Sequence, residues 1–201
     1  MDDAAYFDGL FSGTAVMAIL RGMQRDRTLE SARRAWELGI SAVEVPVQTP
    51  EAAEVLGEVV AAGRRAGREV GAGTVTTLDR VGTARRLGCA FTVAPGVDPE
   101  AAAASRAAGM AHLPGVGSAT DIQQAMRCGC TWVKVFPAAA LGARWLSAMR
   151  GPFPALRIVA TGGIDAHNAA EFLDAGADVV AVGSALADPT QIPALARLNE
   201  R

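Results

Sequence analysis

Two ionisable residues, Lys134 and Glu44, stand inside short apolar runs. Lys134 lies in the run "WVKVF" and Glu44 in the run "AVEVPV". An isolated ionised side chain is expensive to remove from water, so each needs a partner of opposite charge or a chemical task. A neutral buried amine can attack a ketone and form a Schiff base, and a carboxylate within reach can move the protons that this reaction requires. Together the two residues could cleave a carbon–carbon bond close to a ketone.

Strand alternation predicts that both side chains point into the same interior. In a strand, successive side chains face opposite sides. Val43 and Val45 flank Glu44, and Val133 and Val135 flank Lys134. If the valines pack outward against helices, both charged groups point inward. A buried ion pair without a task is the structural alternative, although such pairs are weak stabilisers because desolvation offsets much of the attraction.

Three more polar residues, Arg21, Thr74 and Thr161, stand at the ends of other predicted strands. Ionisable and polar groups that converge on one place are typical of functional sites. A cationic Arg21 near Lys134, together with removal from water, would disfavour the ammonium form and expose a nucleophilic amine. This convergence favours a catalytic site over a structural ion pair.

A second signal lies in two glycine-containing segments near the end of the chain. Gly162 and Gly163 stand in "TGGI" before a predicted helix, and Gly183 and Ser184 follow the next predicted strand. Barrels often bind phosphate at the loops after strands seven and eight, where backbone N–H groups approach the anion. The sequence predicts a phosphate site here, with tight turns as the alternative.

Short β-branched runs recur along the chain, and an Ala-, Leu- and Arg-rich stretch follows most of them. The predicted strands are Val16–Leu20, Ala42–Val47, Val70–Val75, Phe91–Pro95, Ala111–Pro114, Trp132–Pro137, Arg157–Thr161 and Val179–Val182. The predicted helices are Leu29–Leu38, Glu51–Ala66, Leu78–Leu87, Pro99–Ala108, Ala119–Arg127, Ala143–Met149, Ala166–Ala175 and Gln191–Leu198. Alternating strands and helices indicate βαβ units and a parallel sheet.

Eight such units favour a closed (β/α)8 TIM barrel of the α/β class, formed by residues 1–201 as a single domain with an extra N-terminal helix over Asp3–Phe11. Catalytic groups are then expected at the carboxyl ends of the strands. An open doubly wound sheet is the alternative. It usually carries a glycine-rich turn after its first strand, where this chain has Arg21-Gly22-Met23.

The composition and charge of the chain argue against two classes of protein, those that bind nucleic acids and those that span membranes. The chain has 201 residues, of which 50% are hydrophobic and 20% charged, with a formal net charge of -2. Nothing indicates a nucleic-acid or membrane partner, and no apolar stretch approaches the ~18 residues of a membrane span. The expectation is a soluble, cytoplasmic protein. Its three cysteines, Cys89, Cys128 and Cys130, are expected to be free thiols, and His112 and His167 to be structural.

The motifs resemble, in order, those of the class I aldolases that cleave 2-keto-3-deoxy-6-phosphogluconate (KDPG) or its galactonate epimer to pyruvate and glyceraldehyde 3-phosphate. The resemblance runs from about Val16 to Ala187. It rests on "AILRG" (18–22), "VEVPVQTP" (43–50), "GAGTV" (71–75), "APG" (94–96), "PGVGSATD" (114–121), "VKVFPA" (133–138), "GPFP" (151–154), "TGGI" (161–164) and "VGS" (182–184).

The resemblance implies a homotrimeric barrel without a metal or another cofactor. It implies that Lys134 forms the Schiff base and that Glu44 is the general acid/base. Arg21 and Thr74 would hold the carboxylate and keto region of a small-molecule substrate, and Phe136 and Pro95 would line the cleft. Four residues would cradle the phosphate: Gly162, Gly163, Gly183 and Ser184.

The chain departs from the gluconate-type pattern after the catalytic glutamate. That pattern is typically Thr-Leu-Arg-Thr, whereas this chain carries Gln48 in place of the arginine. Gln48 and "AILRG" resemble the galactonate-type enzymes, while Thr161 resembles the gluconate type. The resemblance therefore leaves both C4 epimers open and shifts carboxylate recognition toward Arg21. Gln48 and Thr161 are nevertheless expected to be among the substrate-binding residues.

Three other functions remain open on the sequence. An aldolase for 4-hydroxy-2-oxoglutarate or an unphosphorylated keto acid would use the same amine without the phosphate site. A phosphate-binding isomerase or epimerase would need an acid/base pair and no Schiff base. A non-catalytic phosphate-binding barrel would bind the substrate and leave it unchanged.

Overall fold

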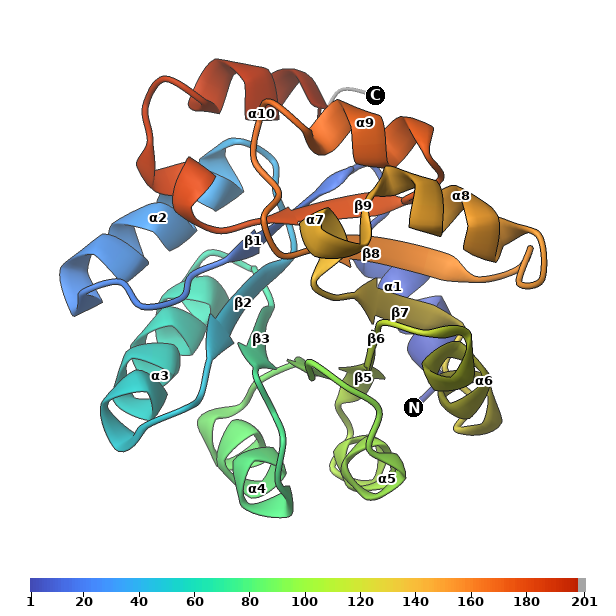
Figure 1. Ribbon diagram of the computed structural model, residues 1–201. Coiled ribbons are helices and arrows are strands. Elements are labelled where there is room, and N and C mark those ends of the chain that lie inside the picture. Colours follow the sequence, from blue (N-terminus) through green and yellow to red (C-terminus); the bar gives the residue numbers. More distant parts are fainter. Residues whose placement is uncertain (199–201) are drawn as a thin grey trace.

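The structure is a computed structural model in which residues 1–198 are described, and its strands form a ring surrounded by helices (Figure 1). The strands are β1 (Val16–Ile19), β2 (Val43–Pro46), β3 (Val70–Gly73), β4 (Phe91–Val93), β5 (Ala111–Leu113), β6 (Gly115–Val116), β7 (Trp132–Val135), β8 (Arg157–Thr161) and β9 (Val179–Val182). The TIM-type α/β architecture predicted from the sequence is confirmed.

All paired strands run parallel, in the spatial order β5-β4-β3-β2-β1-β9-β8-β7-β6. β5 matches the predicted strand Ala111–Pro114 up to Leu113, and the short β6 beyond Pro114 was not predicted. Proline has no N–H group to donate to a neighbouring strand, so the ladder breaks there. The Pro114 carbonyl still accepts a bond from the Lys134 N–H at 2.8 Å, which ties β7 to the break.

Helices cover the outside of the ring (Figure 1). They are α1 (Asp3–Leu10), α2 (Arg25–Glu37), α3 (Pro50–Arg65), α4 (Leu78–Leu87), α5 (Pro99–Ala107), α6 (Ala119–Arg127), α7 (Ala138–Leu141), α8 (Ala143–Arg150), α9 (Ala169–Asp174), α10 (Ile192–Leu198) and the 3-10 helix η1 (Ser184–Ala187). Within residues 1–198, no helix has the length and apolar character to cross a membrane.

Two apolar clusters show that the alternation predicted for the strands is correct. Val43, Val45, Val133 and Val135 belong to the cluster between the barrel and its helices. The other cluster fills the barrel interior and includes Phe7 and Phe11 from the N-terminal segment, packed on Phe91 and Trp132. α1 therefore closes the end of the barrel where the strands begin, and it lies behind the ring in Figure 1.

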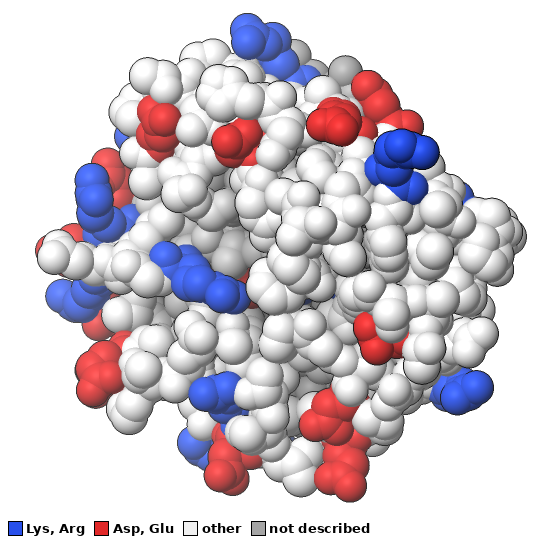
Figure 2. All heavy atoms as spheres, viewed as in Figure 1, with Lys and Arg blue, Asp and Glu red and all other residues white. Residues whose placement is uncertain are grey.

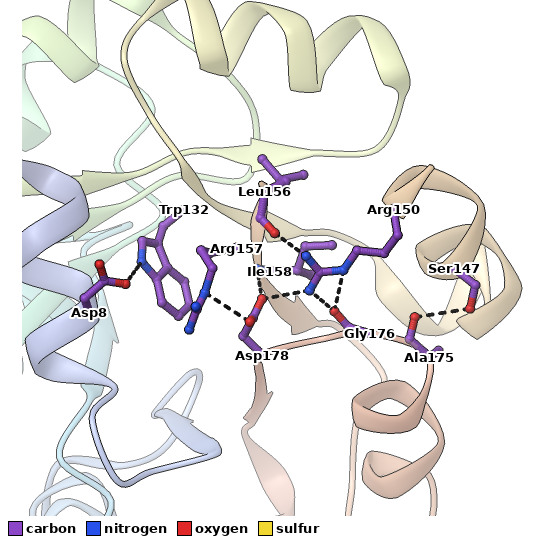
Figure 3. Close-up of polar contacts among 10 residues, drawn as sticks. All are labelled: Asp8, Trp132, Ser147, Arg150, Leu156, Arg157, Ile158, Ala175, Gly176 and Asp178. Atoms are coloured by element: carbon purple, nitrogen blue, oxygen red, sulfur yellow. Dashed lines mark hydrogen bonds and ion pairs between the residues drawn. The ribbon is translucent and has the colours of Figure 1, made fainter. Parts of the chain in front are cut away.

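The strand that carries Lys134 is anchored at this closed end by Trp132 (Figure 3). The Trp132 Nε1–H donates to Asp8 Oδ1 of α1 at 2.9 Å, and the Arg157 guanidinium lies 4.8 Å from the Trp132 ring centroid. Arg157 also pairs with Asp178, which in turn pairs with Arg150 of α8 at 2.9 Å. Buried aromatic and paired charged groups thus hold the start of β7 in a fixed position.

His112 lies outside the barrel in a buried polar cluster beneath α5. Its Nδ1 is 2.9 Å from Thr92 Oγ1, whose hydroxyl also contacts Ser105 Oγ at 2.9 Å. The imidazole is fully buried. Burial is the main cause that lowers the His112 pKa to about 4, and nearby Arg106 lowers it further, while Asp98 acts in the opposite direction. His112 is thus a core residue, and a structural role remains the expectation for it.

We expect His112 to make folding pH-dependent between about pH 6.5 and pH 4. The unfolded chain takes up a proton near the ordinary histidine pKa of ~6.5, whereas the folded chain resists protonation until about pH 4. Acidification through this window should therefore remove up to about 3 kcal/mol of stability. Urea unfolding at pH 7 and pH 4.5 measures the loss. His112→Asn, which cannot titrate, should lose less than the wild type, and equal losses would contradict the assignment.

Candidate active site

Lys134 and Glu44 meet inside the barrel. They enter from β7 and β2, and the Lys134 Nζ lies 3.5 Å from Glu44 Oε1. The Lys134 side chain is 3% exposed and that of Glu44 is 0% exposed. The centroid of the Phe136 ring lies 5.8 Å from Lys134 Nζ. The amine is thus enclosed by an aromatic ring and a carboxylate, which separates it from bulk water.

The Glu44 carboxylate is buried without conventional hydrogen bonds. Among the described residues, no group donates a hydrogen bond to Glu44 Oε1 or Oε2. The 3.5 Å separation from Lys134 is within ion-pair range but longer than a good charge-assisted hydrogen bond. A buried polar group without a partner is unusual in a native structure and calls for an explanation. Here the lone pairs are available to a water molecule or a substrate hydroxyl.

Two glycines of β3 create the space for this arrangement. A Cβ atom at Gly73 would lie 2.2 Å from Glu44 Oε1, and one at Gly71 would lie 2.1 Å from the Phe91 ring. Gly71 therefore admits the ring that fills the barrel floor, and Gly73 admits the carboxylate above it. The sequence reasoning missed this role of Gly73. The signal was the alternating Gly-Ala-Gly pattern, since glycine inside a strand often marks close approach of another group.

Arg21 and Thr74 contact each other at the mouth of the barrel. The Arg21 Nη2 donates to Thr74 Oγ1 at 3.2 Å. Arg21 follows β1 and is exposed, while Thr74 directly follows β3 and is half-buried. The pair therefore presents a cationic donor and a hydroxyl on the side of the ring that also carries Glu44.

A cavity of about 410 Å³ opens between the ends of β1, β8 and β9. Figure 2 shows a hollow near the middle of this face, with basic atoms at its rim. The cavity is lined by Ile19, Arg21, Phe136, Thr161, Gly162, Gly163, Ile164, Asp165, Ala181, Gly183 and Ser184. Phe136 connects it with Lys134, because the same ring lines the cavity and faces the amine.

The turn after β8 is shaped by its two glycines. Gly162 and Gly163 have φ angles of 95° and 74°, values that other residues rarely adopt. A Cβ atom at Gly163 would lie 2.6 Å from the Ala139 side chain. Asn168 fixes the turn, because its Nδ2 donates to the Gly163 carbonyl at 2.8 Å. The glycines thus bring bare backbone to the cavity wall, where an anion can approach it.

Asp165 is the acidic residue on this wall. Its Oδ1 accepts hydrogen bonds from the backbone N–H groups of His167 and Asn168 at 2.8 and 3.2 Å. These bonds turn the carboxylate toward the start of α9 and compensate part of its charge. His167 itself is exposed and precedes α9. That helix starts at Ala169, about one turn later than the start at Ala166 predicted from the sequence.

Three of the predicted substrate-binding residues do not line this cavity: Thr74, which contacts Arg21 at its edge, Pro95 and Gln48. Pro95 is exposed and does not line the cavity. The Gln48 side chain is also exposed, and it lines a separate cavity between α2 and α3 together with Met23 and Val55. The carbonyl of Gln48 is occupied by Arg80 of α4. The structure therefore brings seven of the predicted residues to one cavity, namely Arg21, Phe136, Thr161, Gly162, Gly163, Gly183 and Ser184.

A known protein family matches nearly the whole chain. Residues 9–198 match the family model described as KDPG and KHG aldolase. A 2-dehydro-3-deoxy-6-phosphogalactonate aldolase of Escherichia coli is 32% identical over 173 residues, which cover 85% of this chain and 83% of that enzyme. A 2-dehydro-3-deoxy-phosphogluconate aldolase of Treponema pallidum is 39% identical over 156 residues, which cover 76% and 72%.

Solved structures agree with the sequence matches. KDPG aldolase from Legionella pneumophila, with pyruvate captured at low pH as a covalent carbinolamine intermediate, superimposes with a TM-score of 0.81 at 27% identity, covering 95% of each chain. A native KDPGal structure superimposes with a TM-score of 0.79 at 29% identity, covering 92% of this chain and 90% of that one. The similar proteins thus carry the names of both C4 epimers.

Proposed function

The chain belongs to the KDPG and KHG aldolase family, and on this premise we propose that it cleaves a phosphorylated 2-keto-3-deoxy sugar acid to pyruvate and glyceraldehyde 3-phosphate. It is an aldolase, and therefore a lyase, of the Schiff-base class. One observation carries the assignment of roles within the site. The buried amine of Lys134 lies 3.5 Å from a carboxylate whose oxygens have no hydrogen-bond donor among the described residues.

The chemistry begins at Lys134. Its neutral amine attacks the C2 ketone, and the resulting carbinolamine loses water to give an iminium ion. Glu44 accepts the proton of the C4 hydroxyl, the C3–C4 bond breaks, and its electron pair moves into the iminium to form an enamine. Glyceraldehyde 3-phosphate leaves. Protonation of the enamine at C3 and hydrolysis then release pyruvate and restore the amine.

The two ends of the substrate have separate partners in this proposal. Arg21 and Thr74 hold the carboxylate at the mouth of the barrel, where their side chains already contact each other. The backbone at Gly162, Gly163 and Gly183 and the Ser184 hydroxyl hold the phosphate on the cavity wall. Phe136 and Thr161 lie between these ends and contact the middle of the sugar chain.

Borohydride reduction in the presence of pyruvate tests the Schiff base. Lys134 is the only lysine in the sequence, so a reduced adduct can form only there or at the chain's α-amino group. We expect a whole-protein mass gain that maps to Lys134 and is lost in Lys134→Met. A mass gain confined to the α-amino group, or none at all, would overturn the proposed function.

Ser184→Ala should mainly reduce turnover of phosphorylated substrates. Loss of one hydrogen bond to a charged group corresponds to a fall in kcat/KM of about 10- to 100-fold. The unphosphorylated 2-keto-3-deoxy acid should be affected by less than about twofold. The remote, exposed Ser12→Ala variant is the matched control. Equal losses for both substrates would show that Ser184 does not bind the phosphate.

A turnover assay with a second substrate, 4-hydroxy-2-oxoglutarate, tests the alternative activity, because the family model that matches also covers KHG aldolases. The compound 4-hydroxy-2-oxoglutarate carries a carboxylate in place of the phosphorylated end. If the wild type turns it over as fast as the phosphorylated acids, the cavity wall serves either anion. Assays of the gluconate and galactonate epimers side by side establish the C4 preference.

Gly73→Ala should disable proton transfer while leaving the Schiff base intact. The added methyl group would overlap the Glu44 carboxylate and displace it. A misplacement of about 1 Å in a catalytic group can cost about 100-fold in kcat. Pyruvate trapping at Lys134 should continue. The matched control is Gly82→Ala in α4, where the added Cβ meets only Arg86 Nη1 at 3.5 Å. Unchanged kcat in Gly73→Ala would contradict the role given to Glu44.

The homotrimer and the cytoplasmic location are proposals supported by the family resemblance. Light scattering after size-exclusion chromatography measures the oligomeric state directly. A mass of three chains is expected, and a mass of one or two chains would refute the trimer.

A further inference from the structure

Thr74 has an unusual backbone conformation for its residue type. Its φ angle is 57°, and of the non-glycine residues described by the structure it alone has a positive φ. β-Branched residues rarely adopt this left-handed conformation, which costs on the order of 1–3 kcal/mol. Surrounding contacts must therefore hold the Thr74 backbone in place.

Arg80 of α4 supplies those contacts. Its Nη1 donates to the Thr74 carbonyl at 3.2 Å and to the Thr76 hydroxyl. Its Nη2 donates to the Gln48 carbonyl at 3.3 Å. A single guanidinium thus joins the backbone after β3 to the backbone after β2, the strand that carries Glu44. The planar fork of arginine allows these contacts simultaneously, which the single ammonium of lysine does not match.

We propose that Arg80 is a positioning residue for the pyruvate half of the substrate. By holding the Thr74 carbonyl, it keeps the residue in its left-handed conformation, and that conformation directs the hydroxyl to Arg21 at 3.2 Å. Arg80 does not line the cavity at β1, β8 and β9, so it acts through Thr74. The inference rests on the proposed function, because it takes Arg21 and Thr74 as the groups that hold the carboxylate.

Arg80→Ala tests this role through pyruvate affinity. The measured quantity is the pyruvate concentration that gives half-maximal borohydride trapping at Lys134. We expect it to rise about tenfold, the equivalent of about 1.4 kcal/mol, with the same extent of trapping at saturation. Arg85→Ala removes an exposed arginine from the same helix and should change the value by less than about twofold. Unchanged half-saturation in Arg80→Ala would overturn the inference.

A second pair of variants separates positioning from general stabilisation of the loop. Glycine adopts positive φ without strain, so Thr74→Gly no longer needs its carbonyl held, although it loses the hydroxyl. Adding Arg80→Ala to Thr74→Gly should therefore change half-saturation by less than about twofold. A further tenfold rise in the double variant would show that Arg80 acts elsewhere, and would overturn the inference.

Arg80→Lys keeps the test decisive if the alanine variant does not fold. Lysine preserves the charge but cannot bond the Thr74 and Gln48 carbonyls together as the guanidinium fork does, so half-saturation should rise at least about threefold. A wild-type value for Arg80→Lys would contradict the fork. If the wild type traps pyruvate and the Arg80 variants reach half-maximal trapping at the same pyruvate concentration as the wild type, only this inference fails. If the wild type traps none at Lys134, the proposed function fails as well.

Discussion

Lys134→Met should abolish the proposed aldol cleavage. The variant keeps the length and apolar body of the side chain but has no amine, so neither the Schiff base nor the electron sink for the C3–C4 bond can form. We expect kcat to fall by about 10⁵-fold, the scale of losses seen when the nucleophile of a covalent mechanism is removed. A coupled assay of released pyruvate measures the fall. Substantial residual turnover, within about tenfold of the wild type, would refute the mechanism.

Stability must be controlled in this experiment. Removal of the ammonium leaves the fully buried Glu44 carboxylate without its ion-pair partner, and breaking a buried pair typically costs about 3–5 kcal/mol. The double variant Lys134→Met with Glu44→Gln removes both charges and should recover much of that loss. If the double variant is as stable as the wild type and still inactive, the missing activity reports missing catalytic groups and not a missing fold.

Glu44→Gln should give the second largest effect. The amide is nearly isosteric with the carboxylate, so it fits beside Gly73, but it cannot accept the C4 hydroxyl proton. General acid–base catalysis typically contributes about 10²- to 10⁴-fold, and we expect kcat to fall within that range. The measurement is turnover of the phosphorylated keto acid at saturating concentration.

Pyruvate trapping provides the control for Glu44→Gln. Lys134 remains present, so the reduced adduct should still form when the incubation with pyruvate is long. An outcome in which turnover is lost and the adduct persists assigns Glu44 to proton transfer. Undiminished turnover would contradict that assignment and would require another base. Within the described residues, Glu44 is the acidic group paired with Lys134.

Much of the fold could be predicted from local patterns. The β-branched runs and intervening Ala-, Leu- and Arg-rich stretches placed the strands, because burial on both faces demands continuous apolar residues. The patterns failed where a single residue or a polar turn decided the outcome. The predicted strand Ala111–Pro114 ends one residue early, at Leu113, because Pro114 has no N–H group for the ladder, and the short β6 beyond it was not predicted. α2 begins at Arg25, one turn before the predicted start at Leu29. The prediction started too late because the first turn of this helix is polar and shows no apolar periodicity.

Local sequence patterns were enough to single out the residues to which we assign the chemistry. Strand alternation alone directs Glu44 and Lys134 inward, since side chains two residues apart share a face. The glycine-containing segments after the last two strands also follow from the chain order, because consecutive parallel strands end on the same face of a barrel. These inferences need only the local periodicity of the backbone.

How these groups meet depends on the folded chain as a whole. The 3.5 Å approach of Lys134 to Glu44 depends on residues 90 positions apart and on the absence of a side chain at Gly73. Gln48 lines a different cavity, although its sequence position suggested a role in substrate binding. The contact of Arg80 with Thr74 follows from how α4 packs on the barrel. Such distances are set by strand register and helix packing, and these arise from the whole core at once.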